Sequence, residues 1–193
     1  TQKIKFEILK ALKKIIIIFI VLMNCVSFSQ EKENCSILKY ENKGIIIKAP
    51  NGWVLDCESG SESGISAVFY KKGETWENAE TVMYINFASL KIENQNNLND
   101  LISFDIENFK ENYEGIEIKT KEKIKLENFG GFIKYFGGGT YKSFEYLAYL
   151  DLKEFAIMTI ISSRSESELN NNYSNFKELL KSIKVLNIEI QNE

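Results

Sequence analysis

Short runs of β-branched and aromatic residues follow one another along most of the chain, and only two segments break the pattern with helical spacing. Gly, Asn, Asp and Ser bound many of these runs, as is typical of strands joined by turns. Strands are expected at 36–40, 44–49, 65–70, 81–90, 116–126, 131–136, 144–150 and 156–162. A short apolar segment at 53–55 runs back after the turn that ends the second of these strands. Successive strands with two helices predict an α+β fold, an antiparallel sheet of about six to seven strands flanked by helices in an α/β/α sandwich.

The two helical segments each place apolar residues on a single stripe. Asn99 or Asp100 can cap the start of the first helix, and Gly115 follows its end. Ser165 and Glu168 have the spacing of a capping box at the start of the second. The first stripe consists of Leu98, Leu101, Ile102, Ile106, Phe109 and Tyr113, and the second of Leu169, Tyr173, Phe176, Leu179, Leu180 and Ile183.

The N-terminal segment has the order of a secretory signal peptide. A lead with five lysines precedes an unbroken apolar run at 15–23, and small residues follow, which predicts cleavage between Ser29 and Gln30. Spanning a bilayer takes ~20 apolar residues, and this run falls short, so no stable membrane span is expected. The predicted organisation is a signal peptide over 1–29 and a single domain over 30–193, in a protein that is periplasmic or secreted.

Cys25 leaves one alternative for this segment. The residues Leu22, Met23, Asn24 and Cys25 resemble a bacterial lipobox, in which the cysteine is lipidated and becomes the mature N-terminus. Asn24 departs from the small residue that usually precedes this cysteine. A lipoprotein anchored at Cys25 therefore remains the alternative to a protein without an anchor.

The chain contains no histidine, and its formal net charge is −3. The absence of histidine excludes Ser-His-Asp and Cys-His relays and every zinc site that depends on imidazole. Removal of five lysines and Glu7 with the leader makes the net charge −7, which disfavours nucleic acid as a partner. The glycines at 137–139 lack the Gly-Lys-Ser/Thr ending of a phosphate loop. We expect no enzymatic activity, no catalytic residue, no metal site and no cofactor.

Two cysteines remain after cleavage, Cys35 and Cys57. In an oxidising compartment two thiols often pair, so a Cys35–Cys57 disulfide is one interpretation. Two free or buried thiols are the other, because spacing alone does not fix the geometry of a bridge.

Aromatic residues supply the candidate contact surface, Trp53, Trp76 and Tyr84. Such side chains can stack on sugars or anchor a partner protein, although packing in the core also accounts for them.

An acidic loop supplies a second candidate, because Asp56, Glu58 and Glu62 could approach a cation. Their spacing matches no known calcium loop, so a solvated acidic loop is the simpler interpretation.

The order of elements resembles the PsbP-like family, shared by an extrinsic subunit of photosystem II and a small eukaryotic nuclear-transport factor. Uncharacterised secreted bacterial proteins of this fold are similar as well. The matching stretches are 44–53, 67–70, 73–76, 81–88 and 160–163, with Tyr173, Phe176 and Ser182. The motifs are short and hydrophobic, so the resemblance concerns fold more than function, and it brings no catalytic residue.

This resemblance implies a domain that assists larger assemblies. We therefore expect a non-enzymatic module that binds a protein or another component of the cell envelope. The alternative is a periplasmic protein that binds a small ligand or a metal ion.

Overall fold

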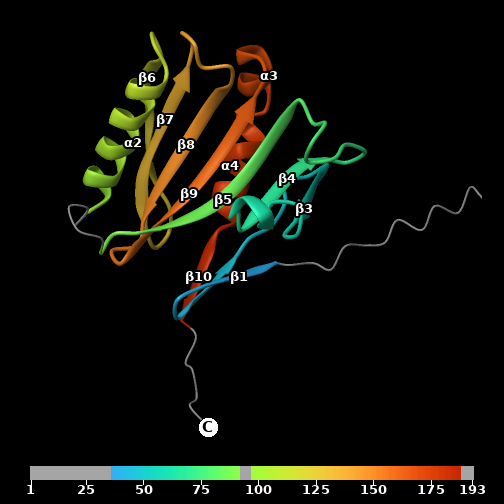
Figure 1. Ribbon diagram of the computed structural model, residues 1–193. Helices are drawn as coiled ribbons and strands as arrows, with labels where there is room; N and C mark the ends of the chain where they lie inside the picture. Colours follow the sequence, from blue (N-terminus) through green and yellow to red (C-terminus); the bar gives the residue numbers. More distant parts are fainter. Residues whose placement is uncertain (1–35, 92–96, 188–193) are drawn as a thin grey trace, which may run out of the picture. The chain divides into compact units, whose positions relative to one another are not determined.

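The structure, a computed structural model, describes residues 36–91 and 97–187. Seven strands form one antiparallel sheet in the order β3-β4-β5-β9-β8-β7-β6, and three form a small sheet in the order β1-β2-β10 (Figure 1). The predicted α+β fold with an antiparallel sheet is thereby confirmed. In chain order the elements are β1 (Ile37–Tyr40), β2 (Lys43–Ile46), β3 (Trp53–Asp56), η1 (Ser61–Ser63), β4 (Ala67–Lys71), β5 (Thr81–Ser89), α2 (Leu98–Asn112), β6 (Glu117–Lys125), β7 (Gly130–Gly137), β8 (Phe144–Asp151), β9 (Phe155–Ser163), α3 (Glu166–Asn171), α4 (Tyr173–Ser182) and β10 (Lys184–Asn187).

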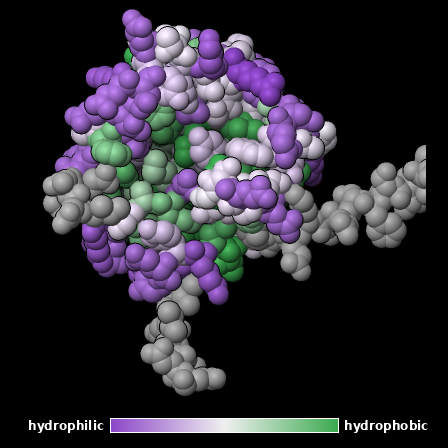
Figure 2. All heavy atoms as spheres, viewed as in Figure 1, coloured by the Kyte–Doolittle hydropathy of each residue, from purple (hydrophilic) through white to green (hydrophobic). Residues whose placement is uncertain are grey.

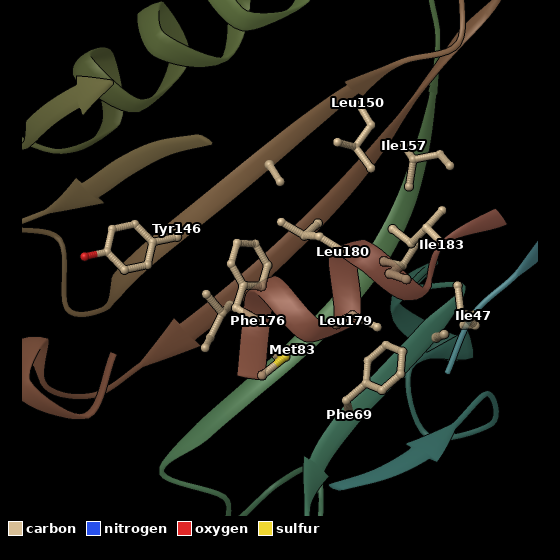
Figure 3. Close-up of a cluster of buried hydrophobic side chains, with 14 of the residues drawn as sticks. Ile47, Phe69, Met83, Tyr146, Leu150, Ile157, Phe176, Leu179, Leu180 and Ile183 are labelled. Atoms are coloured by element: carbon tan, nitrogen blue, oxygen red, sulfur yellow. The ribbon is translucent and has the colours of Figure 1, made fainter. Parts of the chain in front are cut away.

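One face of the large sheet, the closed face, packs against α3, α4 and the small sheet. Every second residue of the central strands points into this core, as the two-residue period of a strand requires. Figure 3 shows Phe176, Leu179 and Leu180 of α4 among side chains that include Met83 and Ile157 from the sheet. All five are almost completely buried. The apolar inner face predicted for the second helix is therefore confirmed.

The opposite face, the half-open face, is covered less completely. Helix α2 buries Leu98, Leu101 and Ile102 against residues of β7, β8 and β9, including Leu147 and Ile160. A separate small cluster covers the β4 end of this face, where Val68, Tyr70 and Ala79 are buried and Val54, Ile65, Trp76, Val82 and Tyr84 pack against them. Because most residues on both faces of β8 and β9 are buried, these strands read as nearly continuous apolar runs.

The second helical segment is interrupted, unlike the continuous helix expected from its apolar stripe. Helix α3 ends and α4 begins at Asn172, which is buried and has φ −97° and ψ 3°. The Asn172 side chain donates to the Glu168 carbonyl oxygen at 2.8 Å and shares that acceptor with its own backbone amide, which donates at 3.1 Å. The capping box is confirmed in part, because the Ser165 hydroxyl accepts from the Glu168 amide at 3.3 Å.

The first helix begins at Leu98, before both of its predicted caps, Asn99 and Asp100. Asn97 is the N-cap, and its side-chain oxygen accepts from the backbone amides of Asn99 and Asp100, the two residues proposed for that role. Among the described residues, no helix combines the length and the apolar character needed to cross a bilayer. The signal peptide, Ser29, Gln30 and Cys25 lie outside the described residues, so these predictions stay predictions.

Strand β10 was not expected from the sequence. It pairs antiparallel with β2 and places Val185 opposite Ile45 and Leu186 opposite Gly44. The pairing closes the small sheet on the side away from β1.

Candidate functional site

Between α2 and the segment that carries Trp76, the half-open face has a strip of side chains that keep part of their surface exposed. Helix α2 packs against β8 and part of β9, and the segment that carries Trp76 packs against β4 and part of β5. Six residues of β5 and β9 on this face are half-buried, whereas Ala156 and Ile160 of β9 are buried. We call the six the open strip: Val82, Tyr84, Asn86, Ala88, Met158 and Ser162. Figure 2 shows apolar residues in the middle of this face with hydrophilic residues on both sides. The strip is the candidate contact surface.

Two of the three aromatic residues proposed from the sequence meet at the edge of this strip. The rings of Trp76 and Tyr84 lie edge to face, with centroids 6.0 Å apart. Both side chains are half-buried, so part of each remains available to a partner.

Trp53 does not belong with them, which corrects the proposed surface. It is 5 % exposed and packs in the core of the closed face. The reason is register, because Trp53 pairs with Lys71 and so projects to the same side as Phe69. Trp53 stabilises the core and is not available to a partner.

A buried carboxyl group lies beside the open strip. Glu145 of β8 is 5 % exposed and lies directly opposite Ser162 of β9. Burial raises the pKa of the Glu145 carboxyl, and hydrogen bonds from Ser162 and Tyr141 offset part of that increase. Within 36–91 and 97–187, no ion pair joins Glu145 to a lysine or arginine.

Two tyrosines complete what we call the Glu145 cluster: Glu145, Ser162, Tyr84 and Tyr141. Burial raises the pKa of the Tyr84 hydroxyl, and the charge of Glu145 raises it further. The pKa of Tyr141 rises for the same two reasons and also through its hydrogen bond to Glu145. A phenol with the ordinary pKa of 10 is already protonated at neutral pH, and these shifts make ionisation still less favourable, so both hydroxyl groups can serve as hydrogen-bond donors.

A second carboxyl group lies further along the same face. Asp105 of α2 accepts a hydrogen bond of 3.0 Å from the hydroxyl of Tyr149 on β8. Burial raises the pKa of Asp105, and the hydrogen bond from Tyr149 lowers it in part. The half-open face therefore carries two partly or fully buried carboxyl groups that are held by neutral hydroxyl donors.

Aromatic rings line the side of the cluster formed by the end of α2. The ring of Tyr141 lies 4.7 Å from that of Tyr113 and 5.5 Å from that of Phe109, centroid to centroid. Phe109 also packs against Phe136 of β7, at 4.6 Å. The loop between β7 and β8 thus folds onto the helix and brings Tyr141 to the Glu145 carboxyl.

The acidic loop is held by its own hydrogen bonds. Asp56 is 1 % exposed, and its carboxylate accepts from the Tyr70 hydroxyl at 2.9 Å and from the Ser59 hydroxyl at 2.7 Å. It also accepts from the backbone amides of Glu58 and Ser59. In the part of the chain that the structure describes, no three His, Cys, Asp or Glu side chains are grouped as metal ligands would be. Asp56 acts here as a structural residue of the loop.

Cys57 follows Asp56 and forms a disulfide. Cys35 lies outside the described residues, so the Cys35–Cys57 pairing remains a prediction.

Sequence reasoning did not single out Glu145, although a signal was present. In the run 144–150, Glu145 is the only charged residue, and Leu147 and Tyr149 share its side of the strand. A carboxyl group in a strand that is apolar on both sides must be buried unless the strand lies at an edge. The strand order that makes β8 an interior strand was not available from its own residues.

Comparison with solved structures finds similarity in fold. The solution structure of cyanobacterial PsbP from Synechocystis sp. PCC 6803 matches with a TM-score of 0.49 and 14 % identity, over 80 % of this chain and 96 % of that one. The Saccharomyces cerevisiae Ran-binding protein Mog1p matches with a TM-score of 0.44 and 11 % identity, over 72 % and 89 %. A Pseudomonas aeruginosa protein of unknown function, titled a putative regulator, has a TM-score of 0.44 and 8 % identity, over 76 % and 93 %.

At these identities and TM-scores the matches carry no conclusion about the family or the function of this chain. No protein-family model matches the sequence. No curated protein matches it either.

Proposed function

We propose that this chain is a non-enzymatic binding module that acts outside the cytoplasm and contacts a protein of the cell envelope through the open strip. The observation that carries the proposal is the asymmetry of the large sheet. Its closed face is filled by two helices and a second sheet, whereas β5 and β9 carry half-buried apolar residues on the other face. An apolar strip with a polar border is typical of protein contact sites. The signal-peptide order of residues 1–29 supports the location.

The dimensions of the strip favour a protein segment over a small ligand. From Val82 to Ala88 the strip follows seven residues of β5, a length of about 20 Å at the rise of an antiparallel strand. Small-molecule sites enclose most of their ligand in a concave pocket, whereas this strip is an elongated part of a sheet face. Trp76 and Tyr84 at its edge are residue types that often anchor a partner.

Site-specific photo-crosslinking in the native host tests the proposal. A photoreactive phenylalanine analogue at Asn86, in the open strip, is expected to capture a defined protein. The same analogue at Ser174, an exposed residue of α4, is the matched control and is expected not to capture it. Purified partner should then bind the Ala88→Arg variant at least tenfold more weakly than wild type and bind Ser174→Arg normally. Equal capture at both positions, or unchanged affinity of Ala88→Arg, contradicts the proposal.

The location has its own test. Sequencing of the mature protein is expected to start at Gln30. A mature chain that begins with a lipid-modified Cys25 would instead support the lipoprotein alternative.

A further inference from the structure

Glu145 presents a physical problem that the fold alone does not solve. Its side chain is 5 % exposed, and the residues in register beside it are Phe136 on β7 and Ser162 on β9. A buried carboxylate is costly unless it is paired with a cation or takes up a proton. Neither the helix nor the loops packed on this face supply a lysine or arginine to it within the described residues.

Within the described residues, the groups that hydrogen-bond to Glu145 are neutral. Ser162 and Tyr141 are neutral donors, which stabilise a carboxylate less than a cation does. Asp105, on the same face, adds a second carboxyl group, and the pKa of Tyr149 responds to both charges. When Glu145 is ionised, the cluster is a site of negative potential in an apolar environment, where electrostatic attraction is stronger than in water.

The cluster borders the open strip. Ser162 lies between Glu145 on β8 and Val82 on β5 in the strand register, and its side chain is half-buried. Tyr84 belongs to the strip, and its hydroxyl group lies near enough to Glu145 for the carboxylate to raise its pKa. A side chain of a partner that lies on the strip can therefore contact Ser162 and Tyr84, which neighbour the Glu145 carboxyl.

The chemistry of the cluster fits an organic cation better than a metal ion. Calcium takes six to eight oxygen ligands, and a single carboxyl group among aromatic rings offers too few. An ammonium or guanidinium group is instead attracted both by a carboxylate and by the faces of tyrosine and tryptophan rings. Tyr84 and Tyr141 supply such rings beside Glu145, and Trp76 lies against Tyr84.

We infer that the Glu145 cluster receives a lysine or arginine side chain of the protein that lies on the open strip. The inference rests on the proposed function, and it adds the chemical character of the partner, a basic segment. The ammonium or guanidinium group pairs with the Glu145 carboxylate and lies against the neighbouring aromatic rings.

A fluorescence titration tests this inference. Trp53→Phe leaves Trp76 as the reporter, since these are the two tryptophans of the chain. The probe is an acetylated and amidated peptide of three Gly-Arg repeats, and its citrulline analogue has the same shape without the charge. The arginine peptide is expected to change Trp76 fluorescence saturably and to bind at least tenfold more tightly than the citrulline peptide.

Two variants locate the effect. Glu145→Gln removes the charge but keeps the size and hydrogen bonding of the side chain, and it should weaken arginine-peptide binding at least tenfold. Glu178→Gln removes the same charge from an exposed position on α4 and should change binding less than twofold. The comparison of arginine with citrulline uses the unchanged Glu145, so it decides the matter even if Glu145→Gln does not fold.

The inference is overturned if both peptides bind equally, if neither binds, or if a folded Glu145→Gln variant binds as wild type does. Should Ala88→Arg still abolish binding of the crosslinked partner in that case, the proposed function stands without this inference. Should Ala88→Arg leave partner binding unchanged, the proposed function itself fails.

Discussion

The two faces of the large sheet are built from the same strands but are stabilised in different ways. On the closed face, residues such as Phe69, Phe155 and Phe176 are fully buried, and the core continues into the small sheet. On the half-open face, apolar packing under α2 gives way to polar groups, among them Glu145, Asp105 and Asp56. Apolar burial stabilises in proportion to area, whereas a buried carboxyl group stabilises only through its partners.

This difference indicates where function is to be sought. A protein keeps costly polar groups inside its fold mainly where they hold a local structure or perform a task. Asp56 clearly holds a loop, because its carboxylate accepts four hydrogen bonds from nearby donors. Glu145 accepts fewer hydrogen bonds, from Ser162 and Tyr141, and it lies beside the open strip, which is why the half-open face is the functional candidate.

The largest expected effect separates the two tryptophans. Trp53→Ala should lower the free energy of unfolding by about 3–5 kcal/mol, because it leaves a cavity in the core of the closed face. Trp76→Ala should cost about 1–2 kcal/mol, since the half-buried ring loses less apolar contact. Urea denaturation followed by circular dichroism measures both. Equal losses would mean that the two faces contribute alike to stability.

The loop at the β3–β4 end of the half-open face depends on a single carboxylate. Asp56→Ala should lower the free energy of unfolding by about 2–3 kcal/mol, because buried donors such as the Tyr70 hydroxyl lose their acceptor. Tyr70→Phe removes one of these bonds and should cost about 1 kcal/mol. Urea denaturation of both variants tests this order. A loss below 1 kcal/mol in Asp56→Ala would show that water replaces the carboxylate.

Glu145 should make stability depend on pH with a defined sign. Its pKa is raised in the folded protein, so the folded state holds the proton more tightly and stability falls as pH rises above the ordinary value of 4.5. Glu145→Gln lacks this loss, so its stability relative to wild type should increase with pH from 4.5 until the folded carboxyl has ionised. Each unit of pKa elevation corresponds to ~1.4 kcal/mol.

Urea denaturation of wild type and Glu145→Gln at several pH values measures this difference. Asp105 is present in both proteins, so its own raised pKa cancels. A difference that does not change with pH would show that Glu145 ionises normally in the folded protein.

The smallest expected effect concerns the helix of the half-open face. Asn97→Ala removes the side-chain acceptor for two backbone amides at the start of α2 and should cost about 1 kcal/mol. Asn99→Ala, one residue from the cap and exposed, is the matched control and should change stability by less than about 0.5 kcal/mol. Hydrogen exchange at the α2 amides would show whether the loss is local to the helix.

Most strands and the first helix were predictable because their periodicities are strong. The run 81–90 alternates between two apolar faces, and β5 covers Thr81–Ser89. Strand β10 was missed because Lys184–Asn187 is a strand of four residues that directly follows a helix and has no turn residue before it. Its pairing partner β2 lies far away in the sequence, and no local pattern reports such a contact.

The candidate site was predictable only in part, and the reason is geometric. Trp76 and Tyr84 were proposed and do meet, but Trp53 was grouped with them although the pairing of β3 with β4 sends it to the other face. Which side of a sheet a residue faces depends on the strand register, and a shift of one residue reverses it. To predict that Glu145 is buried, the strand order is needed as well, because it makes β8 an interior strand.

The pairing of β10 with β2 has a consequence for how the polypeptide becomes a finished molecule. Residues Lys184–Asn187 must join residues Lys43–Ile46, so the small sheet cannot be completed until nearly all of the described chain has been delivered. A polypeptide threaded through a membrane from its N-terminal side would hold β2 with one vacant edge throughout transit. Premature truncation before Lys184 would leave that edge exposed to other chains, a known route to aggregation.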